Sequence, residues 1–135
     1  MKNFVKWFGI IAFAAVIGFS MVGCDLNEKD YEMLNGVWDR GDIVVTFNND
    51  TAVFTQINSG SGWKQIQSSG YVKIGDKKFK SISKTGDLKW SCQELGYYTD
   101  YSGLSGWDEC TITMDSNGQT LHTSNTLGSF TYTKK

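Results

Sequence analysis

The sequence has no proline, one histidine and three cysteines among its 135 residues. It is rich instead in aromatic residues, with 5 tryptophans, 6 tyrosines and 8 phenylalanines, and it has 15 glycines. Aromatic side chains favour strands, and glycines supply the tight turns that join them. The composition therefore predicts a β-rich fold with large side chains in its core.

Residue types that carry catalysis or hold metals are scarce. His122 stands alone, and the sequence has neither a Cys-x-x-Cys pair nor a Gly-x-Ser-x-Gly segment. Residues 115–118 begin like a calcium loop but lack its later oxygen ligands, and their Asn-Gly pair is typical of a hairpin turn. We therefore expect no catalytic residue, no metal site and no cofactor, and we predict that the protein is not an enzyme.

The first 23 residues have the features of an export signal. Lys2 and Lys6 precede a charge-free run from Trp7 to Val22, and the small residue Gly23 stands directly before Cys24. Signal peptides combine these features. The run is shorter than the roughly 20 residues that a membrane-spanning helix needs. A plain secretory signal and a signal anchor are the alternatives.

A cysteine after a small residue, here in Met21-Val22-Gly23-Cys24, resembles the lipobox of bacterial lipoproteins. The resemblance implies cleavage before Cys24 and a diacylglycerol on its thiol, so the membrane becomes a partner. It divides the chain into a signal peptide over 1–23, a lipidated Cys24 with a polar tether over 24–34, and a domain over 35–135. It also implies the bacterial cell envelope, with the outer membrane or cell surface favoured and the periplasmic face possible.

The two remaining cysteines, Cys92 and Cys110, are an even number in an oxidising compartment, which favours a disulfide between them. Both fall on the apolar faces of their predicted strands. We predict that a Cys92–Cys110 disulfide staples the base of a long loop, and a pair of free thiols is the weaker alternative.

Charge is unevenly distributed along the chain. Loss of Lys2 and Lys6 with the signal leaves acidic residues in excess, so we predict no nucleic-acid partner. Solvated lysines that guard sheet edges are favoured over a basic face for anionic lipid headgroups or glycans. The lysines in question lie on one predicted hairpin and its neighbour and are Lys73, Lys77, Lys78, Lys80, Lys84 and Lys89.

Short runs of alternating apolar and polar residues follow one another between turn residues, as in Ile43–Asn48. The predicted strands cover 36–39, 43–48, 51–57, 63–74, 77–83, 88–95, 109–114, 119–123 and 129–133, with Gly70 as a bulge and no helix longer than two turns. Sequential hairpins hide their edges by closing into a barrel. We therefore predict an all-β fold, an antiparallel up-and-down β-barrel of about eight strands, whose interior either holds a small ligand or is filled.

A Gly-x-Trp segment opens the first predicted strand, in Leu34-Asn35-Gly36-Val37-Trp38, and resembles the lipocalin, or calycin, group. The Thr-rich segments 112–118 and 130–135 are similar to those of small lipocalin-like lipoproteins of bacteria. The resemblance covers residues 34–135 and implies a lipocalin-like barrel with a hydrophobic small molecule as ligand. It also implies that Trp38 packs on the barrel floor beneath Lys134 or Lys135.

Aromatic residues on a predicted loop over 96–107 are the main candidates for binding, because Tyr and Trp offer large contact areas at small entropic cost. The candidate binding residues are Trp63, Trp90, Tyr97, Tyr98, Tyr101 and Trp107. Two interpretations stay open: a binding loop, and a lid whose aromatic rings belong to the core.

The sequence thus favours a membrane-anchored exported lipoprotein whose non-catalytic barrel binds a small hydrophobic or amphipathic ligand. The first alternative is a protein-interaction module, either a hydrolase inhibitor or a binder of host proteins, that acts through the 96–107 loop. A structural role in the envelope is the second. A roomy apolar interior favours ligand binding, and a filled interior with a projecting loop favours protein interaction.

Overall fold

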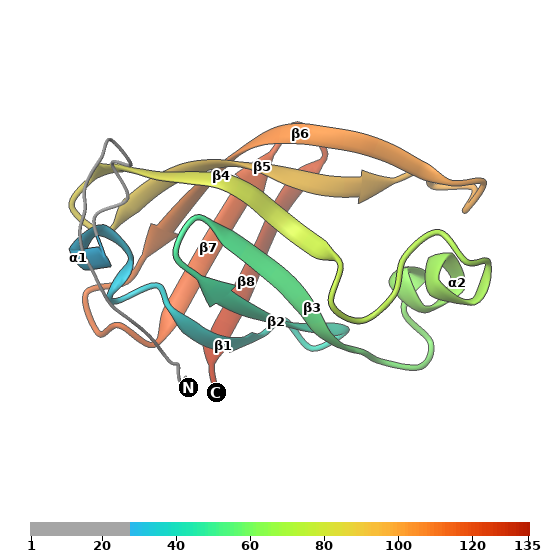
Figure 1. The fold of residues 1–135 in the computed structure, drawn as a ribbon, viewed down its shortest axis with the longest axis horizontal. Coiled ribbons are helices and arrows are strands. Elements are labelled where there is room, and N and C mark those ends of the chain that lie inside the picture. Colours follow the sequence, from blue (N-terminus) through green and yellow to red (C-terminus); the bar gives the residue numbers. More distant parts are fainter. Residues whose placement is uncertain (1–27) are drawn as a thin grey trace, which may run out of the picture.

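The computed structural model describes residues 28–135, which form one closed β-barrel. Each strand runs antiparallel to the next, and the last pairs with the first (Figure 1). The elements are α1 (Glu28–Tyr31), β1 (Gly36–Asp39), β2 (Ile43–Asn48), β3 (Thr51–Ile57), α2 (Gly62–Ser68), β4 (Lys77–Gly86), β5 (Lys89–Tyr97), β6 (Leu104–Met114), β7 (Thr120–Asn125) and β8 (Gly128–Lys134). The predicted up-and-down antiparallel barrel is therefore confirmed. The export signal and Cys24 lie outside the described residues.

The strand predicted over 63–74 is wrong, because its first half forms the helix α2. The Ser61 hydroxyl accepts a hydrogen bond from the backbone amide of Lys64 at 3.0 Å, which caps the helix N-terminus. Trp63 and Ile66 lie three residues apart and share the buried face of the helix. Local capping and this spacing favour a helix over an extended segment, and α2 covers one end of the barrel (Figure 1).

Gly70, predicted as a strand bulge, ends this helix instead. Its backbone φ of +87° lies in the region that glycine adopts most readily. The amide of Gly70 donates to the carbonyl oxygen of Gln67, and the amide of Tyr71 donates to that of Ile66. These two bonds form a Schellman motif, which satisfies carbonyl groups that the helix end leaves free.

The segment around α1 closes the opposite end of the barrel, which we call the floor (Figure 1). Tyr31 and Leu34 are buried in the core. The Tyr31 hydroxyl donates to the carbonyl oxygen of Ile82 at 2.8 Å, and the Trp90 indole N–H donates to that of Asp30 at 2.8 Å. The described part of the predicted 24–34 tether therefore packs against the barrel and is fixed to it.

Trp38 packs against this floor segment and is fully buried. Its indole N–H donates to the carbonyl oxygen of Leu34 at 2.8 Å, and the Lys134 ammonium lies 5.0 Å from its ring centroid. Gly36 has a φ of +129°, and a Cβ there would meet the Lys134 side chain at 3.3 Å. The Gly-x-Trp spacing thus lets the last strand bring its lysine over the tryptophan, the contact that the resemblance implied.

Aromatic rings fill the barrel between the floor and the opposite end. Phe47 of β2 stacks on Phe79 of β4, with ring centroids 5.3 Å apart. Phe79 in turn meets Tyr132 of β8 edge to face, at 6.2 Å. Because β4 and β8 lie four strands apart in a closed barrel of eight, they are opposite walls, and these rings bridge the interior. The filled interior, one of the two predicted alternatives, is the one that the structure has at this level.

Candidate functional site

A half-open pocket of about 270 Å³ lies at the α2 end of the barrel, which we call the mouth. Strand ends, the β1–β2 and β7–β8 turns and one side chain of α2 form its walls. Its lining combines four charged residues with aromatic and apolar ones and consists of Arg40, Asp42, Trp63, Lys78, Glu94, Leu95, Gly96, Tyr97, Thr99, Asn125, Leu127 and Phe130. This combination of buried charge and apolar surface in a concave site is typical of small-molecule sites.

Lys78 and Glu94 form a buried ion pair in the mouth pocket. Their Nζ and Oε2 atoms lie 2.7 Å apart, and the two side chains are only 3% and 2% exposed. Lys78 also donates to the carbonyl oxygen of Leu95 at 2.7 Å, and the Asn125 amide donates to Glu94 Oε1 at 2.6 Å. Burial lowers the pKa of Lys78, while the Glu94 carboxylate opposes this shift. A buried pair that is hydrogen-bonded to neighbouring groups is costly to break and fixes the geometry around it.

A β-bulge explains why Lys78 lies inside. In the pairing of β3 with β4, Ala52 is opposite Phe79, and the next residue of β3, Val53, is opposite Lys77. One step along β3 therefore corresponds to two steps along β4. The extra residue is Lys78, so Lys78 and Phe79 are both buried although they are neighbours in sequence. The prediction of a solvated lysine was therefore wrong at this position.

Arg40 and Asp42 form a second ion pair at the mouth. The guanidinium donates from Nε and Nη2 to the two carboxylate oxygens, at 2.7 Å each. Its other contacts are with aromatic rings, since its central carbon lies 4.3 Å from the Phe130 ring centroid and 5.9 Å from that of Tyr132. Burial by itself raises the pKa of Asp42, but the hydrogen bonds and charge of Arg40 and two backbone amides hold it below its ordinary value.

Two buried hydroxyl groups lack a hydrogen-bonding partner within the described chain, those of Thr123 and Tyr132. Burial raises the pKa of Tyr132 well above its ordinary value, so this phenol stays neutral. The charges that act on it include those of Arg40 and Glu94 in the mouth pocket. Unpaired polar groups in a core are uncommon and costly.

The structure brings some of the predicted aromatic residues together at the mouth. Trp63 packs between Phe54 and Tyr97, with ring centroids 4.9 Å and 4.7 Å away. Tyr101 stacks on Tyr97 at 5.8 Å, while Tyr98 is exposed. Tyr97 packs on the buried Trp63, as the lid interpretation predicts, whereas Tyr98 is exposed, as the binding-loop interpretation predicts.

The structure places the other two predicted aromatic residues elsewhere. Trp90 lies in the floor, because its indole N–H donates to the carbonyl oxygen of Asp30 in α1. Trp107 belongs to β6, where the Lys80 ammonium lies 4.3 Å from its ring centroid. The loop between β5 and β6 therefore covers only 98–103, because cross-strand pairing continues past the cysteines as far as Tyr97 and Leu104.

Cys92 and Cys110 face each other on β5 and β6 as buried free thiols, so the predicted disulfide is not formed in the structure. The amide of Met114 donates to the carbonyl oxygen of Leu88, so Leu88 and Met114 form a hydrogen-bonded pair. Hydrogen-bonded and non-hydrogen-bonded pairs alternate along antiparallel strands. Because the register from Lys89 to Gly96 has no shift, Cys92 and Cys110 are a hydrogen-bonded pair as well. Such pairs have Cβ atoms about 5.5 Å apart, wider than the roughly 3.5–4.5 Å of a disulfide. A hydrogen bond with Cys92 and burial raise the pKa of Cys110.

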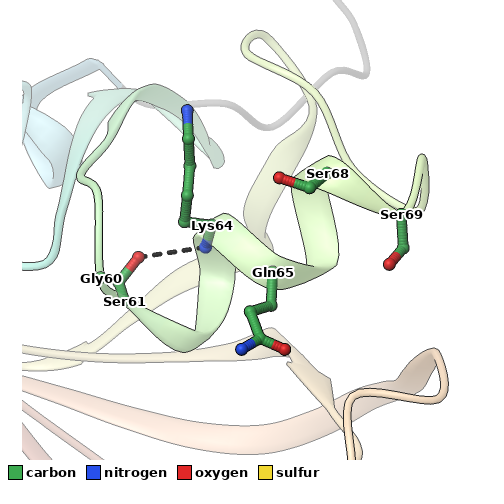
Figure 2. Close-up of a pocket in the computed structure, with 6 residues that line it drawn as sticks. All are labelled: Gly60, Ser61, Lys64, Gln65, Ser68 and Ser69. Atoms are coloured by element: carbon green, nitrogen blue, oxygen red, sulfur yellow. Dashed lines mark hydrogen bonds between the residues drawn. The ribbon is translucent and has the colours of Figure 1, made fainter.

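A larger hollow of about 410 Å³ lies on the outer side of α2 (Figure 2). Its lining is polar and consists of Gly60, Ser61, Lys64, Gln65, Ser68 and Ser69. Lys64 and Gln65 point in opposite directions, and the one hydrogen bond drawn there is the helix cap from Lys64 to Ser61 (Figure 2). Because no set of side chains converges there, the mouth pocket is the better candidate site.

Residues 28–135 contain no group of three or more His, Cys, Asp and Glu side chains that could hold a metal ion. The helices of this part are also too short and too polar to cross a bilayer. Comparisons with known proteins identify no relative: no family model, no curated protein and no solved structure matches the chain. The fold therefore defines a class, a closed eight-stranded antiparallel barrel, and the mouth pocket is its candidate site.

The lowered pKa of Asp42 predicts a pH-dependent stability. The Arg40–Asp42 pair stabilises the fold above the ordinary carboxyl pKa of about 3.9, and this contribution is lost as the pH falls through the lower folded value. Asp42→Asn should cost about 1–2 kcal/mol at neutral pH. Urea unfolding of both proteins should show this difference shrinking below about pH 4.

Asp87→Asn is the matched control, because it removes an exposed carboxylate in the turn between β4 and β5, away from the Arg40–Asp42 pair. A constant difference between the native chain and Asp42→Asn from neutral pH into the acid range would contradict the assignment.

Proposed function

We propose that this chain is an exported lipoprotein of the bacterial cell envelope, anchored through Cys24, whose barrel binds a small amphipathic molecule at its mouth without catalysis. The observation that carries the proposal is the mouth pocket, in which a buried charged pair lies beneath exposed apolar side chains. Leu127 and Phe130 are 69% and 37% exposed beside this pocket, although both are apolar. A ligand that covers them removes apolar surface from water.

The filled interior favours an amphipathic ligand over a wholly apolar one. Phe79 and Tyr132 meet across the barrel, so a ligand at the mouth rests above them instead of entering the whole length of the barrel. The surface it then meets includes the Lys78–Glu94 pair. A wholly apolar molecule would also cover the Arg40–Asp42 pair, whose Asp42 side chain is 40% exposed, without offering it a hydrogen bond, which is unfavourable.

The position of the anchor gives the mouth an orientation. Only three residues separate Cys24 from Glu28, where α1 begins, and the four steps between them span at most about 14 Å. Because α1 is part of the floor, the floor faces the bilayer and the mouth faces away from it. The ligand then arrives from the aqueous side, either at the cell surface or in the periplasm. The contact between Trp38 and Lys134 supports the proposed kinship with lipocalin-like lipoproteins.

A protein-interaction module is the second candidate, favoured by one observation. Tyr98 and Tyr101, on the 98–103 loop, are 54% and 39% exposed at the mouth end. Exposed tyrosines on a short loop suit recognition of a protein surface, either an exported hydrolase or a host protein.

Loss of the anchor is the first expected outcome. Cys24→Ser should remove the lipid and move the protein from the detergent phase to the aqueous phase in phase-separation assays, because one thiol carries the diacylglycerol. Intact-mass spectrometry of the native chain should show the lipid on a chain that begins at Cys24. An unmodified Cys24, or a retained segment 1–23, would sink the lipoprotein assignment.

We also propose that Cys92 and Cys110 form a disulfide after export. Closing the bond needs a small approach of β5 and β6, and such strained bonds are easily reduced. Protein isolated without reductant and denatured in iodoacetamide should stay unalkylated at both positions. After mild reduction it should take up the reagent at both. Full alkylation without reductant would contradict the bond.

Ligand binding is tested on protein purified from its own host in mild detergent. Native mass spectrometry should find a small co-purifying molecule, and Leu127→Asn should lower its occupancy because it removes apolar contact at the mouth. Tyr98→Ala is the control and should keep the ligand. If repeated preparations show only the mass of the protein without a small molecule, ligand binding is refuted. A co-purifying protein that is lost from the Tyr98→Ala variant would favour the second candidate.

A further inference from the structure

The mouth pocket contains N–H groups that are not used in hydrogen bonds to the protein. A guanidinium has five N–H donors, and Asp42 accepts only two of those on Arg40. The ammonium of Lys78 has three donors, and Glu94 and the Leu95 carbonyl accept two of them. The remaining N–H groups of these two side chains have no acceptor within residues 28–135, and both residues line the pocket.

The acceptors of the same pocket are largely occupied. The Asp42 carboxylate accepts the two Arg40 bonds, one on each oxygen. The Glu94 carboxylate accepts from Lys78 on one oxygen and from Asn125 on the other. Each of these oxygens already accepts a bond and each carboxylate is paired with a cation, so a cationic head group gains little there, whereas an acceptor head group would meet free donors.

We infer that the mouth pocket recognises an anionic head group that only accepts hydrogen bonds, a carboxylate in its simplest form, carried on a small apolar body. This rests on the proposed function and names the ligand class of that site. Arg40 is the principal donor, because its planar guanidinium can offer two parallel N–H groups to one carboxylate. Lys78 adds one further donor and a positive charge, at 4.9 Å from the Trp63 ring centroid.

Apolar side chains of the mouth pocket offer a contact surface for the apolar body of the ligand. Leu127 and Phe130 stand beside Arg40, with the guanidinium stacked on the Phe130 ring, and Trp63 lines the same pocket. A head group on Arg40 therefore brings its body against these side chains. The volume of about 270 Å³ limits the body to a short chain or a single ring system.

Three probes with the same alkyl chain test the head group: octanoate, octanol and octyltrimethylammonium. Isothermal titration calorimetry uses the full chain in nanodiscs, with titrations into empty nanodiscs subtracted. We expect octanoate to bind at least about tenfold more tightly than octyltrimethylammonium, with octanol between them, because only the carboxylate meets the free donors.

Arg40→Gln should weaken octanoate binding about tenfold or more and leave octanol binding within about twofold. Lys64→Gln is the matched control, since it removes a cation from the same end of the barrel outside the pocket and should leave both affinities unchanged. If Arg40→Gln fails to fold, the ranking of the three probes on the native chain decides.

Each other outcome has a distinct meaning. Octanol or octyltrimethylammonium binding as tightly as octanoate would overturn the head-group inference and leave the amphiphile-binding proposal intact. Octanoate binding that Arg40→Gln does not weaken would overturn the role of Arg40. Saturable binding of none of the three probes would overturn the inference and argue against the proposed function as well.

Discussion

The bulge at Lys78 is the constraint on which the mouth of this barrel depends. An unbroken strand would bury either Lys78 or Phe79, because successive side chains point to opposite faces. The extra residue turns both inward, and each then has a different task. Phe79 meets Phe47 and Tyr132 and fills the barrel, while Lys78 pairs with Glu94 just above it. The same irregularity thus closes the interior and places a charge at its upper boundary.

The filled interior separates two ends with different chemistry. The floor is held by indole and hydroxyl groups that donate to backbone carbonyls, and by the Lys134 ammonium over Trp38. The mouth instead holds two ion pairs, exposed apolar side chains and a pocket. Because the described chain begins in the floor, a membrane anchor upstream of α1 and a binding site at the mouth would work at opposite ends without interfering.

The barrel could be predicted from the sequence because the signals for strands and turns are local and recur along the chain. Alternation and turn residues marked most of the strands, and the lipocalin resemblance implied a contact of Trp38 with Lys134 or Lys135, of which the structure has Lys134. The error at α2 came from local signals that were interpreted as a strand. The cap at Ser61 and the spacing of Trp63 and Ile66 made a helix where extended structure was predicted, although the serine before the segment and the i, i+3 pair were visible signs.

The candidate site was the harder part to predict. Arg40 and Asp42 stand within a turn segment, and their pairing against Phe130 of β8 depends on the closure of the barrel. Lys78 and Glu94 are distant in sequence and carry no motif, and Asn125 joins them from a third strand. The predicted aromatic residues lie at the mouth, in the floor and on the outer face of β6. The sequence alone does not say at which end of the barrel a residue of a strand lies.

By itself the sequence determined the class of fold and the order of its strands, because periodicity and turn chemistry are properties of neighbouring residues. Only the tertiary structure decided that the interior is filled, that a lysine lies inside the barrel and that four charged side chains meet at one mouth. These features depend on register across strands, where a shift of one residue reverses which side chains are buried. That register is fixed by the closed barrel as a whole.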